Sequence, residues 1–301
     1  MSQVSIIMPV RNGEAYIAAA IASALAQGPA LAEIIVIDDG STDRTAAIVA
    51  GIGDPRIRLI ASPQGGRGVS AARNLGVAAA RAPFLHFLDA DDILRPGALD
   101  ALLAAADPAA IAVYGDYDRI DAEGRPIGRR RLLRRRRKPS GDIRRALLGG
   151  NFIVTGAILI RAEAFRAIGG FATDLRYGED WHAWCRLAAQ GPIRFVPGLQ
   201  VVDYRIHASS TVAGRLLDLD DLMPAIDAVQ TDPVLVAGLS PAERAALRRK
   251  VKAQKDAYCV GQALRTRRYA AGIKGLLAAT LRSPRHAPRL WLVSGAALAG
   301  L

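Results

Sequence analysis

Three acidic residues follow an apolar segment of the chain with almost no spacing. The segment FLHFL at 84–88 leads directly into Asp89, Asp91 and Asp92. Like charges this close repel one another unless a positive group lies between them. Two carboxylates at positions i and i+2, at the end of a strand, can converge on one hard cation such as Mg²⁺ or Mn²⁺. The alternative is a solvated loop in which Asp92 caps a helix.

A second acidic pair, Asp38 and Asp39, ends another apolar segment. A carboxylate at this place can accept a hydrogen bond from the N–H of a nucleotide base such as uracil. Capping of the next helix is the alternative role, but residues 41–43 supply cap-type side chains and leave the pair without a structural task. Further along, the glycine-rich sequence QGGRG at 64–68 precedes a predicted helix, which is a favourable place for phosphate.

A third pair, Glu179 and Asp180, opens a predicted helix over 177–191. Acids in a first turn are favoured by the helix dipole, which is the structural alternative. Trp181 and Trp184 follow, so the sequence predicts an acid beside an aromatic wall. Such a setting suits a general base and the stacking of a sugar.

Arg205 and His207 alternate at the end of the predicted strand segment 193–207 and would share one face of it. A lone histidine is more often structural than a ligand. Beside an arginine and a metal-bound diphosphate, it becomes a candidate metal ligand or phosphate contact.

Apolar strand segments and helical segments alternate through the first part of the chain and must position these side chains. Strands are predicted at 4–10, 33–40, 57–62 and 84–89, and helices at 14–28, 41–51 and 69–81. Unbroken apolar strands separated by helices indicate an α/β fold with a mostly parallel, Rossmann-like sheet covered on both faces. Ligands of such sheets bind beyond the carboxyl ends of the strands, where the acids lie.

The pattern changes beyond this region. A strand and hairpin are predicted at 111–124, and a strand leading into a helix at 151–165. From about residue 215 the sequence is helical and increasingly basic. We therefore predict a catalytic domain at 1–213 and a basic helical region at 214–301.

The 301-residue chain carries 40 basic and 28 acidic residues, a net charge of +12. A chain with this positive charge tends to bind an anionic partner, such as nucleic acid, nucleotide phosphate or a lipid surface. The basic run at 129–138 and the C-terminal helices permit two interpretations. They dock on the cytoplasmic face of a membrane, where each basic residue contributes about 1 kcal/mol, or they form a bundle packed on the catalytic domain or on a second subunit. A nucleic-acid-binding protein explains the charge but not the acids predicted at three strand ends.

Cysteine usage indicates a reducing, cytoplasmic setting. Cys185 and Cys259 are far apart and fit no metal or redox spacing. The first residues show no basic segment or cleavage site of a signal peptide. The apolar tail at 290–301 is too short to span a bilayer but could lie on one.

Taken together, the motifs resemble the family 2 glycosyltransferases, which have the GT-A fold. They occur in the family's order over roughly 4–210: VSIIMPVRNGEAYI, IIVIDDGSTD, GVSAARNLG, FLHFLDADD, GGF…YGEDWHAWCRL and YRIHASS. The resemblance implies an inverting enzyme that uses a nucleotide-sugar donor and a carbohydrate or lipid-linked acceptor. Nucleic acid is not an expected partner, and a homo-oligomer is compatible with the sequence.

The resemblance also implies roles for individual residues. The nucleotide-sugar site would consist of Pro9, Arg11, Asp38, Asp39, Arg73, Asp89, Ala90, Asp91 and Arg205. Asp39 would face the base, and Asp89 and Asp91 would hold Mn²⁺ or Mg²⁺ on the donor diphosphate, with His207 near the metal. Asp180 would deprotonate the acceptor hydroxyl, with Glu179 as the competing candidate.

Two departures from the family pattern matter. Arg11 stands where the family often has tyrosine, so the preferred nucleotide is open, although a guanidinium can also stack on a base. We find neither a Q-x-x-R-W motif nor membrane-spanning segments, both of which processive members carry, and this favours addition of a single sugar. The alternatives are a nucleotidyltransferase, which also uses paired acids and a metal, and a non-catalytic relative.

Overall fold

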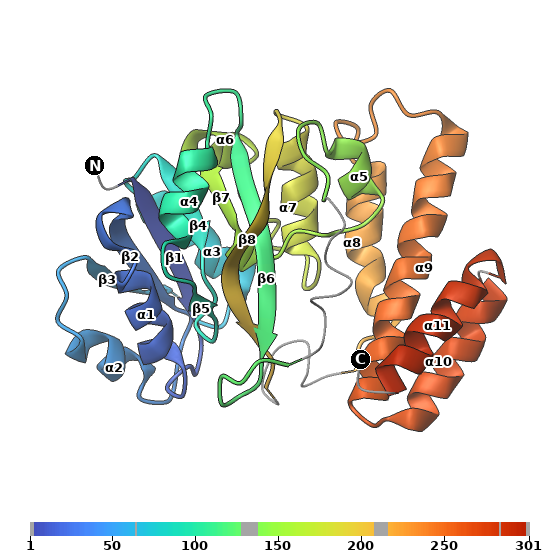
Figure 1. The fold of residues 1–301 in the computed structure, drawn as a ribbon, viewed down its shortest axis with the longest axis horizontal. Coiled ribbons are helices and arrows are strands. Elements are labelled where there is room, and N and C mark those ends of the chain that lie inside the picture. The colour runs from blue at the N-terminus through green and yellow to red at the C-terminus, as the bar shows by residue number, and fades with distance from the viewer. Residues whose placement is uncertain (1–2, 64, 128–137, 208–215, 283, 299–301) are drawn as a thin grey trace.

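A computed structural model describes residues 3–63, 65–127, 138–207, 216–282 and 284–298. Its centre is an eight-stranded sheet with the strand order β3-β2-β1-β4-β7-β6-β8-β5. The C-terminal helices lie beyond one edge of this layered α/β body (Figure 1). The predicted basic run at 129–138 falls, except for Lys138, outside the described residues, as does the predicted boundary at 213–214.

The N-terminal half of the sheet is parallel, as the sequence predicts. Its strands are β1 (Val4–Val10), β2 (Leu31–Asp38), β3 (Ile57–Ala61) and β4 (Phe84–Phe87). They pair in parallel through β3-β2-β1-β4, so their carboxyl ends meet at one edge. Every residue of β1 is buried because helices cover both faces of the sheet.

Two hydrophobic cores lie on the two faces of the sheet. Side chains alternate along β1, so that Ile7 belongs to one core and Ile6 and Met8 to the other. Helix α3 (Val69–Ala79) packs in the core of Ile7. The helices of the opposite core are α1 (Ile17–Leu25), α2 (Thr45–Gly51) and α4 (Ala98–Ala105). Helix α2 begins at Thr45, later than the predicted start at 41–43, because residues 41–45 bind the loop after β1 instead.

The second half makes the sheet mixed rather than wholly parallel. Its strands are β5 (Ile93–Leu94), β6 (Ala112–Ile120), β7 (Ile158–Arg161) and β8 (Ile193–Arg205). Strand β7 is antiparallel to β4 and β6, β5 is antiparallel to β8, and β6 and β8 are parallel. The short helices are α5 (Arg144–Leu148), α6 (Ala162–Ala167), α7 (Glu179–Ala188), and the 3₁₀ turns Gly28–Ala30, Thr155–Ala157 and Pro284–His286.

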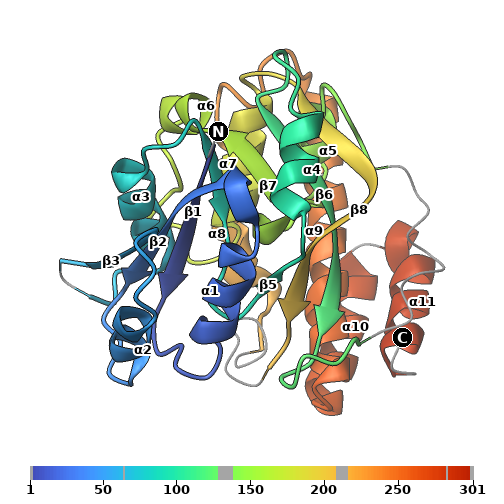
Figure 2. The ribbon, with the colours of Figure 1, turned by 60° about the vertical axis from the view of Figure 1, so that its left-hand side comes forward.

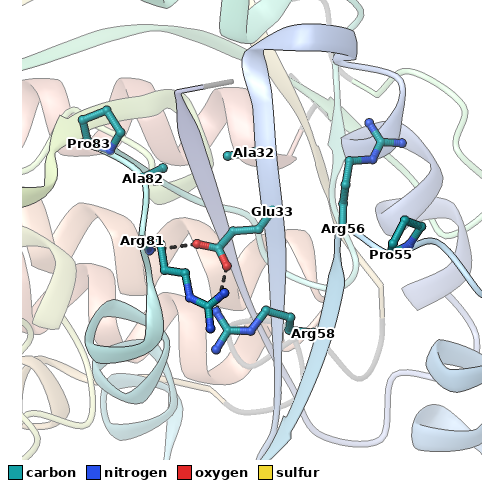
Figure 3. A pocket seen from close by; sticks show the side chains of 8 residues that line it. All are labelled: Ala32, Glu33, Pro55, Arg56, Arg58, Arg81, Ala82 and Pro83. Atoms are coloured by element: carbon teal, nitrogen blue, oxygen red, sulfur yellow. Dashed lines mark hydrogen bonds and ion pairs between the residues drawn. The ribbon is translucent and has the colours of Figure 1, made fainter. Parts of the chain in front are cut away.

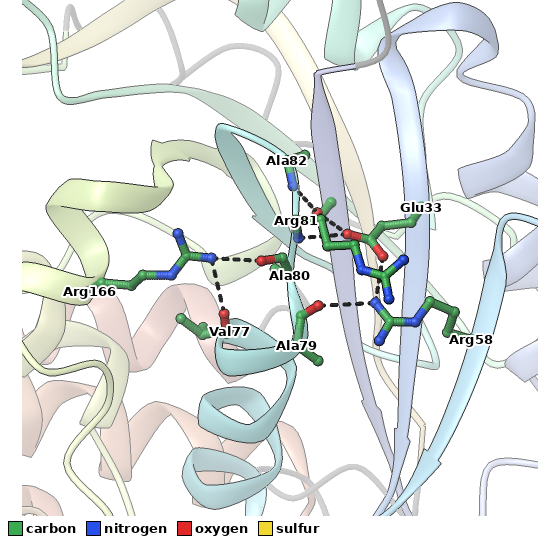
Figure 4. A network of polar contacts seen from close by, with 9 residues as sticks. Glu33, Arg58, Val77, Ala79, Ala80, Arg81, Ala82 and Arg166 are labelled. Carbon is green, nitrogen blue, oxygen red and sulfur yellow. Dashed lines mark hydrogen bonds and ion pairs between the residues drawn. The ribbon is translucent and has the colours of Figure 1, made fainter.

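Arginines fix the C-terminal end of α3 against the sheet (Figure 4). Arg58 donates to the Ala79 carbonyl and to Glu33, while Arg166 donates to the Ala80 carbonyl. Cations favour the negative end of the helix dipole, so these contacts stabilise the helix as well as its position. Burial alone would raise the pKa of Glu33, but hydrogen bonds from the Arg81 N–H and from Arg58 lower it. Because these contacts fix the position of α3, they also hold its first residues in place at the opposite edge of the sheet, where the parallel strands have their carboxyl ends.

The C-terminal helices divide between two cores. They are α8 (Leu219–Thr231), α9 (Pro241–Arg265), α10 (Tyr269–Arg282) and α11 (Ala287–Leu298). Helix α8 and Val251 of α9 share the core of α7, whereas Leu264, Leu276 and Leu290 form a small core of α9, α10 and α11. Within the described part of the chain, no helix combines the length and the apolar character that crossing a bilayer requires.

Candidate active site

Asp39 binds the glycine-rich loop. Its carboxylate accepts hydrogen bonds from the backbone N–H of Arg67 at 3.2 Å and of Gly68 at 2.9 Å, at the start of α3. These are N–H groups of the kind predicted to bind phosphate. The side chain of Asp39 is 5% exposed, and its backbone oxygen accepts from the Gly66 N–H. The interpretation that Asp39 has no structural task is therefore wrong.

Asp38 has a structural contact of its own. Its carboxylate accepts from the backbone N–H of Ser41 at 2.8 Å and so shapes the turn after β2. Asn12, with the positive φ of 55° that asparagine tolerates better than most residues, accepts from the Thr42 N–H and donates its own N–H to the Ser41 hydroxyl. These bonds join the loops after β1 and β2 into one wall of the site.

Arg11 lies over the glycine-rich loop. A Cβ placed on Gly66, which has a φ of +67°, would come within 3.3 Å of the Arg11 Nη1. A side chain at position 66 would thus crowd the guanidinium and strain the backbone. Pro9 is buried within β1, and Ala90 is buried close to Gly13 of the same wall. Arg11 and Asp39 accordingly both lie against one loop.

Arg73 connects the two groups of acids. Its guanidinium donates to Asp89 at 2.7 Å and to Glu179 at 3.0 Å, and it lies 5.3 Å from the ring centre of Phe171. The side chain is 4% exposed, and the two carboxylates raise its pKa against the effect of burial. It is the positive group that the clustered acids require.

Asp91, His207 and Arg205 form a second contact cluster at the end of β8. The His207 Nε2 lies 2.9 Å from an oxygen of Asp91, and the Arg205 Nε donates to the Asp91 backbone carbonyl at 2.8 Å. The ring of Tyr16 packs against both, with 4.7 Å between ring centres to His207 and 4.8 Å to the guanidinium. The predicted common face of Arg205 and His207 is confirmed.

Asp92 is a buried acid rather than a helix cap. It is 1% exposed, accepts the Arg205 backbone N–H at 2.8 Å, and precedes the strand β5. Burial, followed by the charges of Asp89 and Asp91, raises the pKa of Asp92 well above its usual value. Burial and Asp89 likewise raise the pKa of Asp91, against the opposing effect of His207. Arg73 pairs with Asp89 but does not offset the effects of burial and neighbouring charge on Asp91 and Asp92.

The two acids of the third pair, Glu179 and Asp180, have different hydrogen-bond partners. Glu179 pairs with Arg73, and burial together with Asp180 raises the pKa of Glu179 to about 6. Asp180 accepts from the Asn151 side-chain amide at 2.9 Å, and burial raises its pKa despite the nearby Lys255. The Asn151 side-chain oxygen accepts from the Ile153 N–H, which orients the amide group toward Asp180. Both acids can therefore exchange protons closer to neutral pH.

The predicted aromatic wall is wrong. Trp181 and Trp184 have no exposed surface, and both belong to the hydrophobic core around α7. The Trp181 Nε1–H donates to the Leu147 carbonyl at 2.7 Å, which fixes α7 against α5. Trp181 directly follows the acids and Trp184 lies one turn beyond Asp180, but both rings are enclosed by the core, so they stabilise the position of α7 and do not stack on a sugar.

Sequence reasoning missed three residues that contact the site. They are Asn151, Tyr16, and Lys255 of α9, whose Nζ lies 5.2 Å from the Trp181 ring centre. Tyr16 lies within the motif VSIIMPVRNGEAYI, but that motif does not indicate its contact with His207, and Asn151 and Lys255 belong to no motif. Each of the three meets its partner only through tertiary packing. Spacing along the chain gave no signal for them.

The fit of a metal ion rests on Asp91 and His207. Among the side chains described, no three of His, Cys, Asp or Glu already group as a metal site. Asp91 and His207 nevertheless present adjacent oxygen and nitrogen donors that Mn²⁺ accepts, and donor phosphates commonly complete such a shell. Asp89 would first have to leave Arg73. Asp91 and His207 are thus the side chains of this site that fit a metal ion without rearrangement.

A separate hollow of about 420 Å³ lies at the amino ends of β2, β3 and β4 (Figure 3). Arg56, Arg58, Arg81 and Glu33 line it. It contains none of the predicted site residues and lies at the opposite edge of the sheet. Two of its cations are already paired, Arg56 with Asp54 and Arg58 with Glu33. The acids described above therefore form the candidate active site.

Comparison with known proteins identifies the family of this chain. The sequence model described as "Glycosyl transferase family 2" matches residues 5–169. The succinoglycan biosynthesis protein ExoU of Rhizobium meliloti is 31% identical, over 85% of this chain and 77% of the relative. ExoO of the same organism is 41% identical over 41% of this chain, and the alignment spans 36% of that relative.

A solved structure has the same fold. The crystal structure of S. aureus TarS 1–349 in complex with UDP-GlcNAc is similar over 99% of this chain and 89% of the TarS chain, with a TM-score of 0.66 and 16% identity. TarS has also been solved in complex with UDP. The similarity confirms the predicted α/β fold of GT-A type with helices at the C-terminus.

Proposed function

This chain belongs to glycosyl transferase family 2, and from that premise we propose that it transfers one sugar from a UDP-sugar to an acceptor hydroxyl with inversion. The acceptor would be a carbohydrate or lipid-linked carbohydrate of a cell-surface polysaccharide. The observation that supports this proposal most directly is that Arg73 forms ion pairs with both Asp89, after β4, and Glu179, at the start of α7. The names of ExoO and ExoU, succinoglycan biosynthesis proteins, support a polysaccharide product.

The donor would bind at the carboxyl ends of β1, β2 and β4. Asp39 and Arg11, which both lie against the glycine-rich loop, would contact the base, and the crystal structures of TarS with UDP and UDP-GlcNAc support uracil as that base. Arg73 and Arg205 would supply positive charge near the diphosphate. Asp38 would hold the turn that carries Asp39.

We propose that Asp91 and His207, with Asp89 after release from Arg73, hold Mn²⁺ or Mg²⁺. The pKa values of Asp91 and Asp92, raised first by burial and then by neighbouring acids, support this, because a bound cation would favour the charged form of these carboxyl groups. Bound there, the metal would supply positive charge to the leaving diphosphate.

Asp180 would act as the general base. Its carboxylate takes the proton of the acceptor hydroxyl, the acceptor oxygen forms a bond to the anomeric carbon, and the bond to the diphosphate breaks with its electron pair. Asn151 fixes the orientation of that carboxylate, while Glu179 is engaged by Arg73. A carboxylate with a raised pKa is the stronger base.

The test compares two isosteric variants. Asp180→Asn should retain donor binding and lose transfer by roughly 10²–10⁴-fold, the usual scale for a general base. Glu179→Gln is the matched control and should lose less. Near-normal turnover of Asp180→Asn would assign the base to Glu179.

Calorimetric titration with UDP, dTDP, GDP and CMP, each with Mn²⁺ and with EDTA, tests the donor and the metal together. We expect metal-dependent binding of UDP. Equal binding in EDTA would contradict the metal. Release of a nucleoside diphosphate from the sugar donor, rather than pyrophosphate, separates a glycosyltransferase from a nucleotidyltransferase.

We also propose a cytoplasmic location with peripheral contact to the inner membrane face. Both cysteines, Cys185 and Cys259, are free thiols, which supports a reducing compartment.

A further inference from the structure

Helix α10 exposes a row of large apolar side chains. Tyr269, Ile273, Leu277 and Leu281 recur every four residues and are 49%, 55%, 53% and 82% exposed. Residues at this spacing lie one above the other on the same face of a helix. Single exposed apolar residues are common on soluble proteins, but a continuous row marks a contact surface.

Helix α11 extends the same surface. Trp291 and Leu292 are 51% and 75% exposed. The Trp291 Nε1–H donates to the Thr280 hydroxyl at 3.2 Å, so the indole is fixed against α10. We call the six side chains, Tyr269, Ile273, Leu277, Leu281, Trp291 and Leu292, the α10–α11 apolar face. Trp and Tyr with a polar tip and an apolar body suit a boundary between water and lipid.

The opposite side of these helices is already packed. Leu276 and Ala279 of α10 face Val260 and Leu264 of α9 and Leu290 of α11 in a small buried core. The α10–α11 apolar face is therefore not part of the core that holds the three helices together. Within the described residues its side chains stay exposed, so it is available to a partner.

The charge around the face selects that partner. Residues 257–301 contain no Asp or Glu, and their basic residues are Arg265, Arg267, Arg268, Lys274, Arg282, Arg285 and Arg289. The acid that precedes them, Asp256, is 5% exposed and pairs with Arg282. A second copy of this chain would bring the same positive charge and be repelled. An anionic lipid leaflet offers both apolar depth and negative charge.

The α10–α11 apolar face lies at the same end of the molecule as the candidate active site. Figures 1 and 2 show α10 in the lower part of the molecule, toward which the arrows of β1 and β6 point. The carboxyl ends of the parallel strands, with the candidate active site, thus lie at the same end. Docking on lipid would bring the candidate active site close to a lipid-linked acceptor. This consequence rests on the proposed function, but the docking itself does not.

We propose that the α10–α11 apolar face inserts into the interface of an anionic membrane, with Lys274 and the neighbouring arginines at the headgroups. The full chain should cosediment with phosphatidylcholine vesicles containing phosphatidylglycerol, and far less with phosphatidylcholine alone. High salt should weaken the binding without abolishing it, because the apolar part is not screened.

Substitutions separate the apolar and the charged contributions. The triple variant Ile273→Ser, Leu277→Ser, Leu281→Ser should bind vesicles about 100-fold more weakly, roughly fivefold for each lost side chain. Val234→Ser is the matched control, since Val234 is 53% exposed on another surface. Lys274→Glu should weaken binding about tenfold, and Arg244→Glu on α9 is its charge-matched control.

Tryptophan fluorescence reports the insertion directly. Trp181 and Trp184 are fully buried in the core, so a vesicle-induced blue shift must come from Trp291. The shift should vanish in Trp291→Phe while cosedimentation persists. Calorimetric titration with UDP should be unchanged in the triple variant, which distinguishes a failure of docking from a failure of the proposed function.

Three results would overturn the proposal. They are no cosedimentation with phosphatidylglycerol vesicles at low salt, equal binding by the triple variant, and a concentration-dependent dimer that the triple variant abolishes without any vesicle binding. The last result would assign the face to a second copy of this chain.

Discussion

His86 makes the folded protein sensitive to acid, because it is buried in β4 as a neutral ring. It has no exposed surface. The His86 Nδ1 lies 3.1 Å from the Ile158 carbonyl, and a carbonyl only accepts, so Nδ1 carries the proton. The Nε2 atom has no partner within the described part of the chain. Protonation would place an uncompensated charge at the centre of the sheet, and burial lowers the pKa of His86 from 6.5 to about 4.

The size of the effect follows from the difference between the two pKa values of His86. The unfolded chain takes up the proton near the ordinary pKa of 6.5, whereas the folded chain resists until about 4. The stability that the neutral ring contributes is therefore complete above the higher value and is lost progressively as the pH falls from the higher value to the lower one. A tenfold change in proton affinity corresponds to about 1.4 kcal/mol, so the loss approaches about 3 kcal/mol.

Urea unfolding of the wild type and of His86→Asn, at about pH 7.5 and about pH 4.5, measures this loss. Asparagine keeps a donor for the Ile158 carbonyl but does not titrate. The cavity that it leaves lowers stability equally at both pH values, and other acids titrate in both proteins. The wild type should lose about 2–3 kcal/mol more than the variant on acidification. Equal losses would refute a neutral, buried His86.

Other substitutions test the packing and the site. Gly76→Ala would place a Cβ 2.4 Å from the Ile7 Cγ2, so we expect a loss of about 1–3 kcal/mol in urea unfolding; unchanged stability would contradict this contact. Trp181→Phe removes one of the two donors to the Leu147 carbonyl, which keeps the Gly150 N–H, and leaves a cavity in the core; it should lower the melting temperature, at a free energy of about 1–3 kcal/mol. Asn151→Ala releases the Asp180 carboxylate and should lower kcat roughly tenfold with little change in KM; a change in KM alone would argue against a positioning role.

Several elements were predictable because their signal is local. The unbroken apolar segments of β1, β2 and β4 indicate strands buried on both faces, and the structure has them at Val4–Val10, Leu31–Asp38 and Phe84–Phe87. The antiparallel insertion of β7 between β4 and β6 was not predictable, because strand direction depends on how the chain returns. The periodicity of 177–191 indicated a helix but did not tell which of its faces would be buried.

The sequence by itself determined the family, the α/β class and the acids at the strand ends, because residue type and spacing along the chain carry that information. Tertiary structure decided which groups meet. Arg73 reaches Asp89 across 16 positions and Glu179 across 106, and Asn151 reaches Asp180 across 29. It also decided that two tryptophans beside the acids fill the core while Trp291 lies at the surface. Burial and ion pairing depend on distances in space, which no local pattern specifies.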